Sequence, residues 1–164
     1  MSKLESDEVV LEDIPFNLNS IFEEILGVIE HMAAEQNIRI IWEEKEVTHW
    51  NLIGSPVHVK RILMNILSNA VKYNKENGYV YISCREIPSK QTAMTTLEFV
   101  CRDTGIGMTE AFQKRIFEPF AQEHVGSRTK FAGTGLGMPI TKNWWRKWAE
   151  SFPLKVKKAQ GLHL

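Results

Sequence analysis

The chain has 164 residues, of which 43% are hydrophobic and 24% are charged, a composition typical of one soluble globular domain spanning 1–164. Its 20 basic residues balance its 20 acidic residues, which argues against a general nucleic-acid or membrane-surface binder. No run of about 18 apolar residues is present to span a bilayer, and the polar, acidic start does not resemble a signal peptide. Cys84 and Cys101 lie in strand-like runs, so we expect reduced, buried thiols rather than a disulfide or a metal site.

Apolar spacing and turn residues predict the elements along the chain. Pro15 closes the first short strand, which is followed by a helix. Ser55 and Pro56 are typical of an N-cap and a first helical position, so they predict the start of a second helix. The expected strands are 8–13, 38–43, 50–54, 79–85 and 95–102, and the expected helices run from Asn17 or Asn19 to about Asn37 and from Val57 to about Asn74.

The order of these elements indicates the fold class. The runs 79–85 and 95–102 predict an antiparallel hairpin around a polar turn at 88–93. Helices and strands are mixed without strict alternation, which favours an α+β fold, a two-layer α/β sandwich with helices on one face of a mixed, mostly antiparallel sheet. His31 lies in the first helix and is expected to face solvent. In the first helix the residues at helical spacing are Ile21, Ile25, Val28, Ile29 and Met32. In the second helix a broad stripe is expected to be buried, made of Val59, Ile62, Leu63, Ile66, Leu67, Ala70 and Val71.

One face of the second helix carries polar residues that need partners. Asn65, Asn69 and Tyr73 are spaced i, i+4 and i+8, with Lys72 beside them. Asparagine is a poor helix-interior residue. Either the amides cap a loop or bind buried water, or the face lines a ligand cleft, with an amide oxygen toward a hydrated cation, lysine toward phosphate and the aromatic ring over a base. The helix alone leaves both interpretations open.

The strand at 95–102 runs into Asp103, Gly105 and Gly107. A carboxylate at a strand end, followed by Gly-x-Gly, lies beside backbone that a flat ring can approach, and it can accept a hydrogen bond from an exocyclic amine such as that of adenine. An Asx-type turn with glycines serving geometry alone explains the same pattern.

Two further stretches suit a phosphate site. A hinged lid needs an anchor followed by polar chain, which Phe117–Phe120 and the run 122–132 provide. Arg128 and Lys130 could reach a triphosphate from this lid, although basic loops are usually solvated. The stretch Gly133-Thr134-Gly135-Leu136-Gly137 alternates glycines ahead of a plausible helix, a pattern that lets backbone N–H groups approach phosphate.

In this order the four stretches resemble the sensor histidine kinases. Residues 65–73 resemble the N box of that family, 103–107 the first glycine box, 117–120 the F box and 133–137 the second glycine box. The resemblance covers about 7–141. The family shares its ATP-binding sandwich with gyrase B, the mismatch-repair ATPases and a heat-shock chaperone, and the Phe-x-Pro-Phe box points to the kinases among them.

The resemblance implies a role for each matching residue. Asn69 would bind Mg²⁺, with Asn65 and Lys72 beside the phosphates and Tyr73 against the nucleotide. Asp103 would accept the adenine amine. The remaining matching residues would shape the adenine pocket, the lid hinge and the phosphate cradle: Gly105, Gly107, Gly133, Thr134, Gly135, Leu136 and Gly137.

The resemblance also implies an activity. A histidine kinase of this type transfers the γ-phosphoryl group of ATP to a histidine on a dimerisation domain. A response regulator is its further protein partner. That acceptor domain is missing, so we expect this cytoplasmic fragment to bind ATP without autophosphorylation. His31 lacks the neighbouring Glu and Pro of an acceptor site.

The segment 142–164 departs from the family pattern. It begins Lys142-Asn143-Trp144-Trp145, where the family has two glycines and two closing strands. A Trp-rich helix that docks a membrane or a partner is one interpretation. The other interpretation is a one-base frame slip in the gene after about Asn143. Read one base out of frame, the codons of 143–145 must encode Leu-Val and those of 148–149 must encode a glycine. The remaining codons permit the sequence with which the family ends. A slipped chain would lack its last native strands and is expected to self-associate through the altered end.

Two other functions stay open. A non-kinase ATPase of the same superfamily would use ATP for closure, and a degenerate module would bind partners without nucleotide.

Overall fold

The computed structural model describes residues 12–88, 94–116 and 118. In chain order the elements are β1 (Ile14–Asn17), α1 (Leu18–Ala34), β2 (Arg39–Glu46), β3 (Asn51–Gly54), α2 (Pro56–Lys72), β4 (Tyr79–Ile87), β5 (Thr96–Asp103) and α3 (Glu110–Arg115). Within these ranges no helix has the length and apolar character that crossing a membrane requires.

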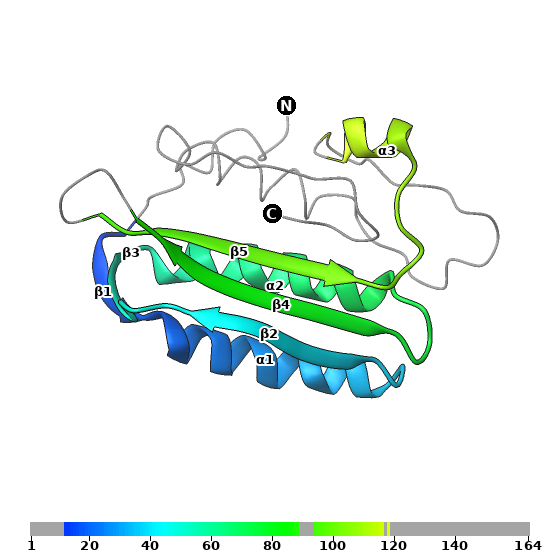
Figure 1. Cartoon of the computed structure of the whole chain (residues 1–164), viewed down its shortest axis with the longest axis horizontal. Coiled ribbons are helices and arrows are strands. Elements are labelled where there is room, and N and C mark those ends of the chain that lie inside the picture. The colour runs from blue at the N-terminus through cyan, green and yellow to red at the C-terminus, as the bar shows by residue number, and fades with distance from the viewer. Residues whose placement is uncertain (1–11, 89–93, 117, 119–164) are drawn as a thin grey trace, which may run out of the picture.

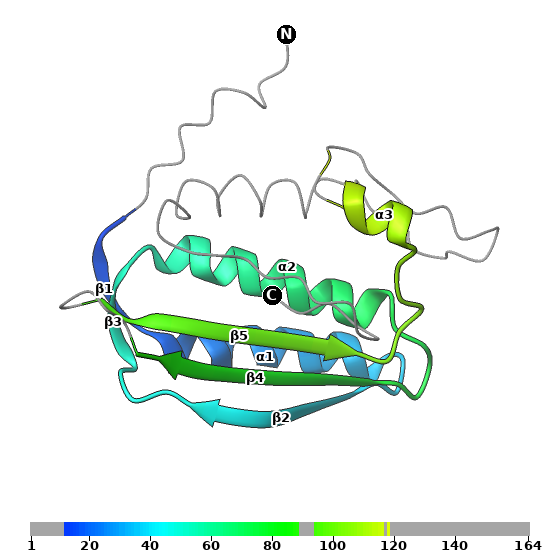
Figure 2. The same cartoon turned by 45° about the horizontal axis from the view of Figure 1, so that its top comes forward.

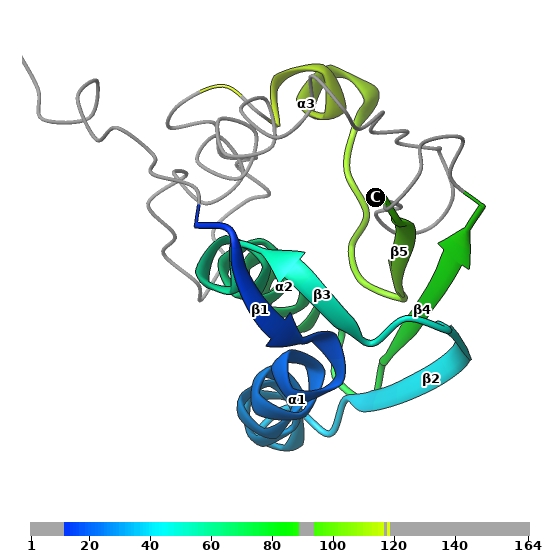
Figure 3. The same cartoon turned by 90° about the vertical axis from the view of Figure 1, so that its left-hand side faces the viewer.

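The elements form two layers. A three-stranded sheet has the order β2-β4-β5, with β2 parallel to β4 and β4 antiparallel to β5. Helices α1 and α2 lie side by side on one face of this sheet (Figures 1 and 3). Strands β1 and β3 pair separately and antiparallel at the start of the two helices (Figure 3). The predicted α+β sandwich is confirmed.

The first strand differs from its prediction. We expected 8–13, yet β1 is Ile14–Asn17, and the described residues Glu12 and Asp13 belong to no strand. Pro15 was expected to end the strand and instead pairs with Ile53 inside it. Proline has no N–H to donate, so it is accepted in a strand with one paired edge, and among the described residues β1 pairs only with β3.

Helix α1 begins where the sequence predicts. Asn17 is its N-cap, and its Oδ1 accepts the N–H of Ser20 at 3.2 Å. The helix ends at Ala34, three residues before the predicted end, because Asn37 adopts a left-handed φ of 54° that no α-helix continues. Ile25 and Ile29 are fully buried and His31 is exposed, as predicted.

Helix α2 begins at Pro56 with Ser55 as N-cap, as predicted, but the cap works differently. The Ser55 hydroxyl makes no side-chain cap bond and pairs instead with Nδ1 of His58 at 2.7 Å. Both side chains are buried. The helix ends at Lys72 rather than near Asn74.

The core lies between the helices and the sheet. Phe22 on α1 meets Trp42 edge-on at 5.2 Å between ring centroids and stacks on Phe99 at 6.0 Å. Cys84 and Cys101 face this core as free, buried thiols, as predicted. Burial raises the pKa of Cys84 to about 11 and that of Cys101 to about 12, so both stay protonated at neutral pH.

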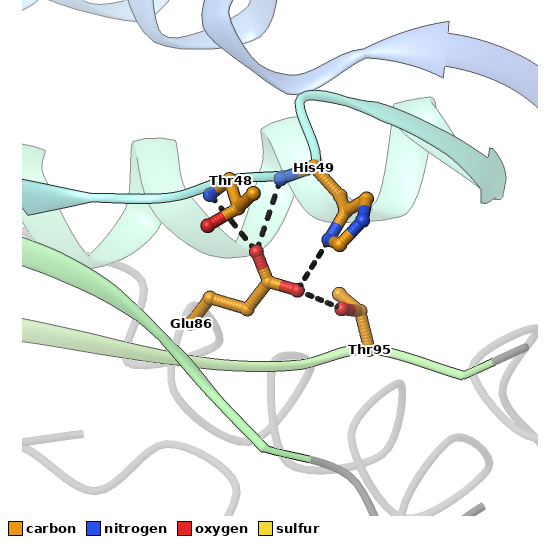
Figure 4. Close-up of polar contacts among 4 residues, drawn as sticks. All are labelled: Thr48, His49, Glu86 and Thr95. Carbon is orange, nitrogen blue, oxygen red and sulfur yellow. Dashed lines mark hydrogen bonds and ion pairs between the residues drawn. The ribbon is translucent and has the colours of Figure 1, made fainter. Parts of the chain in front are cut away.

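One carboxylate holds the loops at one end of the sheet together (Figure 4). Glu86 on β4 accepts the backbone N–H groups of Thr48 at 2.9 Å and His49 at 3.0 Å, from the connection between β2 and β3. It also accepts the Thr95 hydroxyl, just before β5, and contacts Nδ1 of His49 at 2.7 Å. These bonds lower the pKa of Glu86 to about 2, with the Thr95 bond the largest cause.

Stability is expected to fall as the pH drops through about 6.5, the ordinary pKa of an unfolded histidine. Burial, with Arg61 adding to it, lowers the pKa of His58 in the folded protein. The unfolded chain therefore takes up a proton that the folded chain refuses, and this contribution is present above pH 6.5 and lost below it. Thermal unfolding between about pH 8 and about pH 5.5 measures the step. His58→Gln should remove it and His31→Gln should keep it; an equal step in all three proteins would contradict the assignment.

Candidate functional site

The predicted polar face of α2 exists. Asn65 and Asn69 lie one turn apart and half-buried, and the Asn69 amide nitrogen donates to Asn65 Oδ1 at 3.5 Å. Lys72 follows, with its Nζ 5.1 Å from the ring centroid of Tyr73, which is 38% exposed. Because Asn69 donates through its nitrogen, its Oδ1 is the atom that would meet a cation.

Asp103 closes β5 and begins a turn. Its Oδ1 accepts the N–H of Gly105 at 2.8 Å. The Asx-type turn that the sequence left as an alternative is therefore present. An ionised carboxylate has about four lone-pair sites, so this bond is compatible with accepting a further hydrogen bond from a ligand.

The end of α2 and the turn after β5 touch through their backbones. The N–H of Ile106 donates to the carbonyl oxygen of Tyr73 at 3.1 Å. The contact brings the helix that carries Asn65 and Asn69 against the loop that follows Asp103. These residues, 34 or more positions apart in the sequence, therefore belong to one region, where the ends of α2 and β5 lie near each other (Figure 2).

The two glycines of the turn serve different purposes. A Cβ on Gly105 would lie 2.3 Å from the carbonyl oxygen of Tyr73 and 2.7 Å from Asp103 Oδ1. Gly107 has open space around it and a φ of +68°. Gly105 is thus required by close approach, and Gly107 by backbone conformation.

Gly105→Ala is expected to destabilise the protein more than Gly107→Ala. The first pushes the turn off α2, because the atom it meets is backbone; the second adds only left-handed strain of about 1 kcal/mol. Urea unfolding of both variants measures the two costs. Equal costs would contradict the packing of Gly105 against Tyr73.

The sequence interpretation missed Asn74, which contributes to this region. It follows the N-box stretch, is 9% exposed, and bonds to Tyr79 at the start of β4 and to Thr104 directly after β5. The sequence offered one signal for it, an asparagine directly after the residues 65–73. Helix α3 was also missed, although Thr109 caps it by accepting the Phe112 N–H at 3.2 Å.

The other predicted site residues lie outside the described residues. They are Arg128, Gly133, Thr134, Gly135, Leu136 and Gly137, with the lid run 122–132 and the segment 142–164; of Phe117–Phe120, only Glu118 is described. Within 12–88, 94–116 and 118, no three His, Cys, Asp or Glu side chains gather as metal ligands.

Comparison with known proteins decides the family. The family model for the histidine kinase-, DNA gyrase B-, and HSP90-like ATPases matches residues 54–162, which include α2 and the turn after β5. The chain belongs to this ATPase family. The match spans the four stretches between Asn65 and Gly137, and the resemblance is confirmed at the level of the family.

Relatives within the family are sensor kinases. The chain is 34% identical to the signal transduction histidine-protein kinase BarA of Escherichia coli (strain K12) over 141 residues, 86% of this chain and 15% of that protein. The chain thus spans about a seventh of the length of this relative.

Solved structures share the fold. The full-length ShkA structure in complex with AMPPNP matches with a TM-score of 0.72 and 25% identity, over 94% of this chain and 30% of that one. The histidine kinase ThkA in complex with response regulator protein TrrA matches with a TM-score of 0.66 and 22% identity, over 96% and 41%.

Proposed function

We propose that this ATPase domain binds Mg²⁺-ATP and donates the γ-phosphoryl group to a histidine on a dimerisation domain of a longer sensor kinase. The observation that carries the proposal is the contact between α2 and the turn after Asp103. It joins an amide-bearing helix face to a carboxylate at a strand end. A nucleotide needs both, because its base and its phosphates have different chemistry.

Each described site residue has a role that its chemistry supports. Asp103 accepts the exocyclic amine of adenine, and Gly105 and Gly107 give the ring a flat backbone to approach. Tyr73, 38% exposed, offers an aromatic face to the nucleotide. Asn65 and Lys72, on and beside the polar face of α2, approach the phosphates, where the ammonium group of lysine neutralises charge.

The residues fit Mg²⁺ as well. Its preferred ligands are hard oxygens, it keeps several waters, and it is commonly held by few protein groups together with substrate phosphates. Asn69 Oδ1 would be the protein ligand, with Asn65 adjacent. When bound, Mg²⁺ would offset the negative charge of the phosphate oxygens.

The remaining proposals concern parts beyond the described residues. Arg128 and Gly133–Gly137 would form the lid and phosphate cradle. The acceptor domain and a response regulator would be the protein partners, as ThkA is found with TrrA. The location would be cytoplasmic, with no nucleic-acid or membrane contact from this domain. If the frame slip is real, the chain would self-associate through 142–164. Sequencing the gene tests the slip, and the oligomeric state in solution tests the self-association.

Titration of Mg²⁺-ATP onto the whole chain tests the proposed function. Wild type should bind, and Asn69→Ala should reduce the affinity about tenfold in Mg²⁺ while changing it little in EDTA, because only the metal-dependent part is lost. Asn19→Ala is the control, because it removes an asparagine of α1 whose side chain bonds to Glu23 and Lys45 rather than to residues of the candidate site. No binding by wild type would favour the nucleotide-free interaction module instead. Binding that Asn69→Ala leaves unchanged in Mg²⁺ would contradict the assignment of Asn69 as the metal ligand.

A further inference from the structure

A ring of hydrogen bonds joins the end of α2 to the start of β4 and the end of β5. The Asn74 amide nitrogen donates to the carbonyl oxygen of Tyr79 at 2.9 Å, and its Oδ1 accepts the Thr104 hydroxyl at 3.1 Å. Thr104 completes the ring: its Oγ1 accepts the N–H of Tyr79 at 2.9 Å, and its own N–H donates to the Tyr79 carbonyl at 3.1 Å. Each of the three residues is thus bonded to the other two.

The residues around the ring pack closely against its polar atoms. A Cβ on Gly78 would lie 2.3 Å from Asn74 Oδ1 and 2.8 Å from Thr104 Oγ1, so the turn before β4 packs directly on it. Asn74 is 9% exposed, and its Oδ1 also accepts the N–H of Lys75 at 3.0 Å. Buried polar groups that are fully bonded fix one arrangement, and losing one partner leaves the others unsatisfied.

The ring lies between the two halves of the candidate nucleotide site. Asn74 follows α2 five residues after Asn69, and Thr104 directly follows Asp103. We propose that Asn74 and Thr104 are positioning residues that fix the separation between Asn69 and Asp103, so that one nucleotide engages both at once. This inference rests on the proposed function, because it assigns the metal side to Asn69 and the base side to Asp103.

The expected effect is on the coupling of the two sides more than on folding. If the ring loosens, ATP held at Asp103 no longer presents its phosphates at the right distance from Asn69. The gain in affinity on adding Mg²⁺ should then shrink, since that gain needs both ends. A residue that only stabilises the fold would lower the unfolding temperature and leave this gain unchanged in the folded fraction.

The test compares ATP affinity in Mg²⁺ and in EDTA by calorimetry, using the whole chain, with thermal unfolding of each variant alongside. Thr104→Val removes the hydroxyl at constant shape and should cut the Mg²⁺ gain about fivefold, as should Asn74→Ala. Thr104→Ser retains the hydroxyl and should keep the gain within about twofold of wild type. Thr95→Val is the matched control, because it removes a threonine hydroxyl bond at the opposite end of β5.

The outcomes separate the two proposals. Wild type that binds Mg²⁺-ATP, with Thr104→Val and Asn74→Ala folded and showing the wild-type Mg²⁺ gain, would overturn the positioning role alone. An equal loss in Thr95→Val would also overturn it. Wild type that fails to bind ATP would overturn the proposed function and this inference with it. If Thr104→Val unfolds, Asn74→Ala and Thr104→Ser carry the same comparison.

Discussion

Asp103→Asn is expected to weaken ATP binding about 10- to 100-fold. The asparagine keeps the shape of the side chain, and its Oδ1 can still accept the Gly105 N–H that the structure has at 2.8 Å. The second carboxylate oxygen becomes an NH₂ group, a donor facing the donor amine of adenine. A hydrogen bond with a charged partner contributes about 1.5–3 kcal/mol, which corresponds to this loss of affinity.

Equilibrium titration with Mg²⁺-ATP and Mg²⁺-GTP measures the effect. Wild type should prefer ATP, because guanine has a carbonyl oxygen at the position of the adenine amine whose hydrogen bond Asp103 would accept. Asp103→Asn should reduce that preference. Glu98→Gln is a suitable control, since it also neutralises a carboxylate on β5, one that pairs with Arg85 on the surface. Unchanged ATP affinity in Asp103→Asn would remove the carboxylate from adenine recognition.

Leu67→Ala is expected to lower the free energy of unfolding by about 2–5 kcal/mol, the range for deleting a buried leucine side chain. Leu67 on α2 is fully buried between the helices and the sheet. The deletion removes apolar contacts and leaves a cavity that the surrounding strands fill only in part. This loss is comparable to the whole stability of many small domains, so the variant approaches unfolding at 37 °C.

Urea unfolding followed by circular dichroism measures the loss. Val57→Ala is the control on the same helix, with its side chain 45% exposed, and should change stability by less than about 0.5 kcal/mol. A cost below about 1 kcal/mol for Leu67→Ala would mean that α2 does not pack on the core as described.

The sequence alone determined what depends on neighbours along the chain. Ser55 and Pro56 predicted the start of α2, and the spacing of Asn65 and Asn69 placed both on one helix face, because helical periodicity is a local property. The order of four short motifs indicated the ATPase family for the same reason. The first strand was misplaced because Pro15 ends a strand only when its missing donor is needed, and that depends on which strand lies beside it.

Tertiary structure decided how distant segments meet. The parallel pairing of β2 with β4 joins strands that are separated by β3 and α2, and no periodicity encodes it. The sequence explained Gly105 by the geometry of a local turn. In the structure, the carbonyl oxygen of Tyr73, 32 residues earlier in the chain, leaves no room for a side chain at this position. Nothing in the sequence links Asn74 to Thr104, and the fold brings the buried Asn74 and the half-buried Thr104 together. A polar atom that is removed from water without a partner costs free energy, so these side chains bond to each other. The sequence could not predict this ring, because it forms only where the fold brings the ends of α2 and β5 side by side.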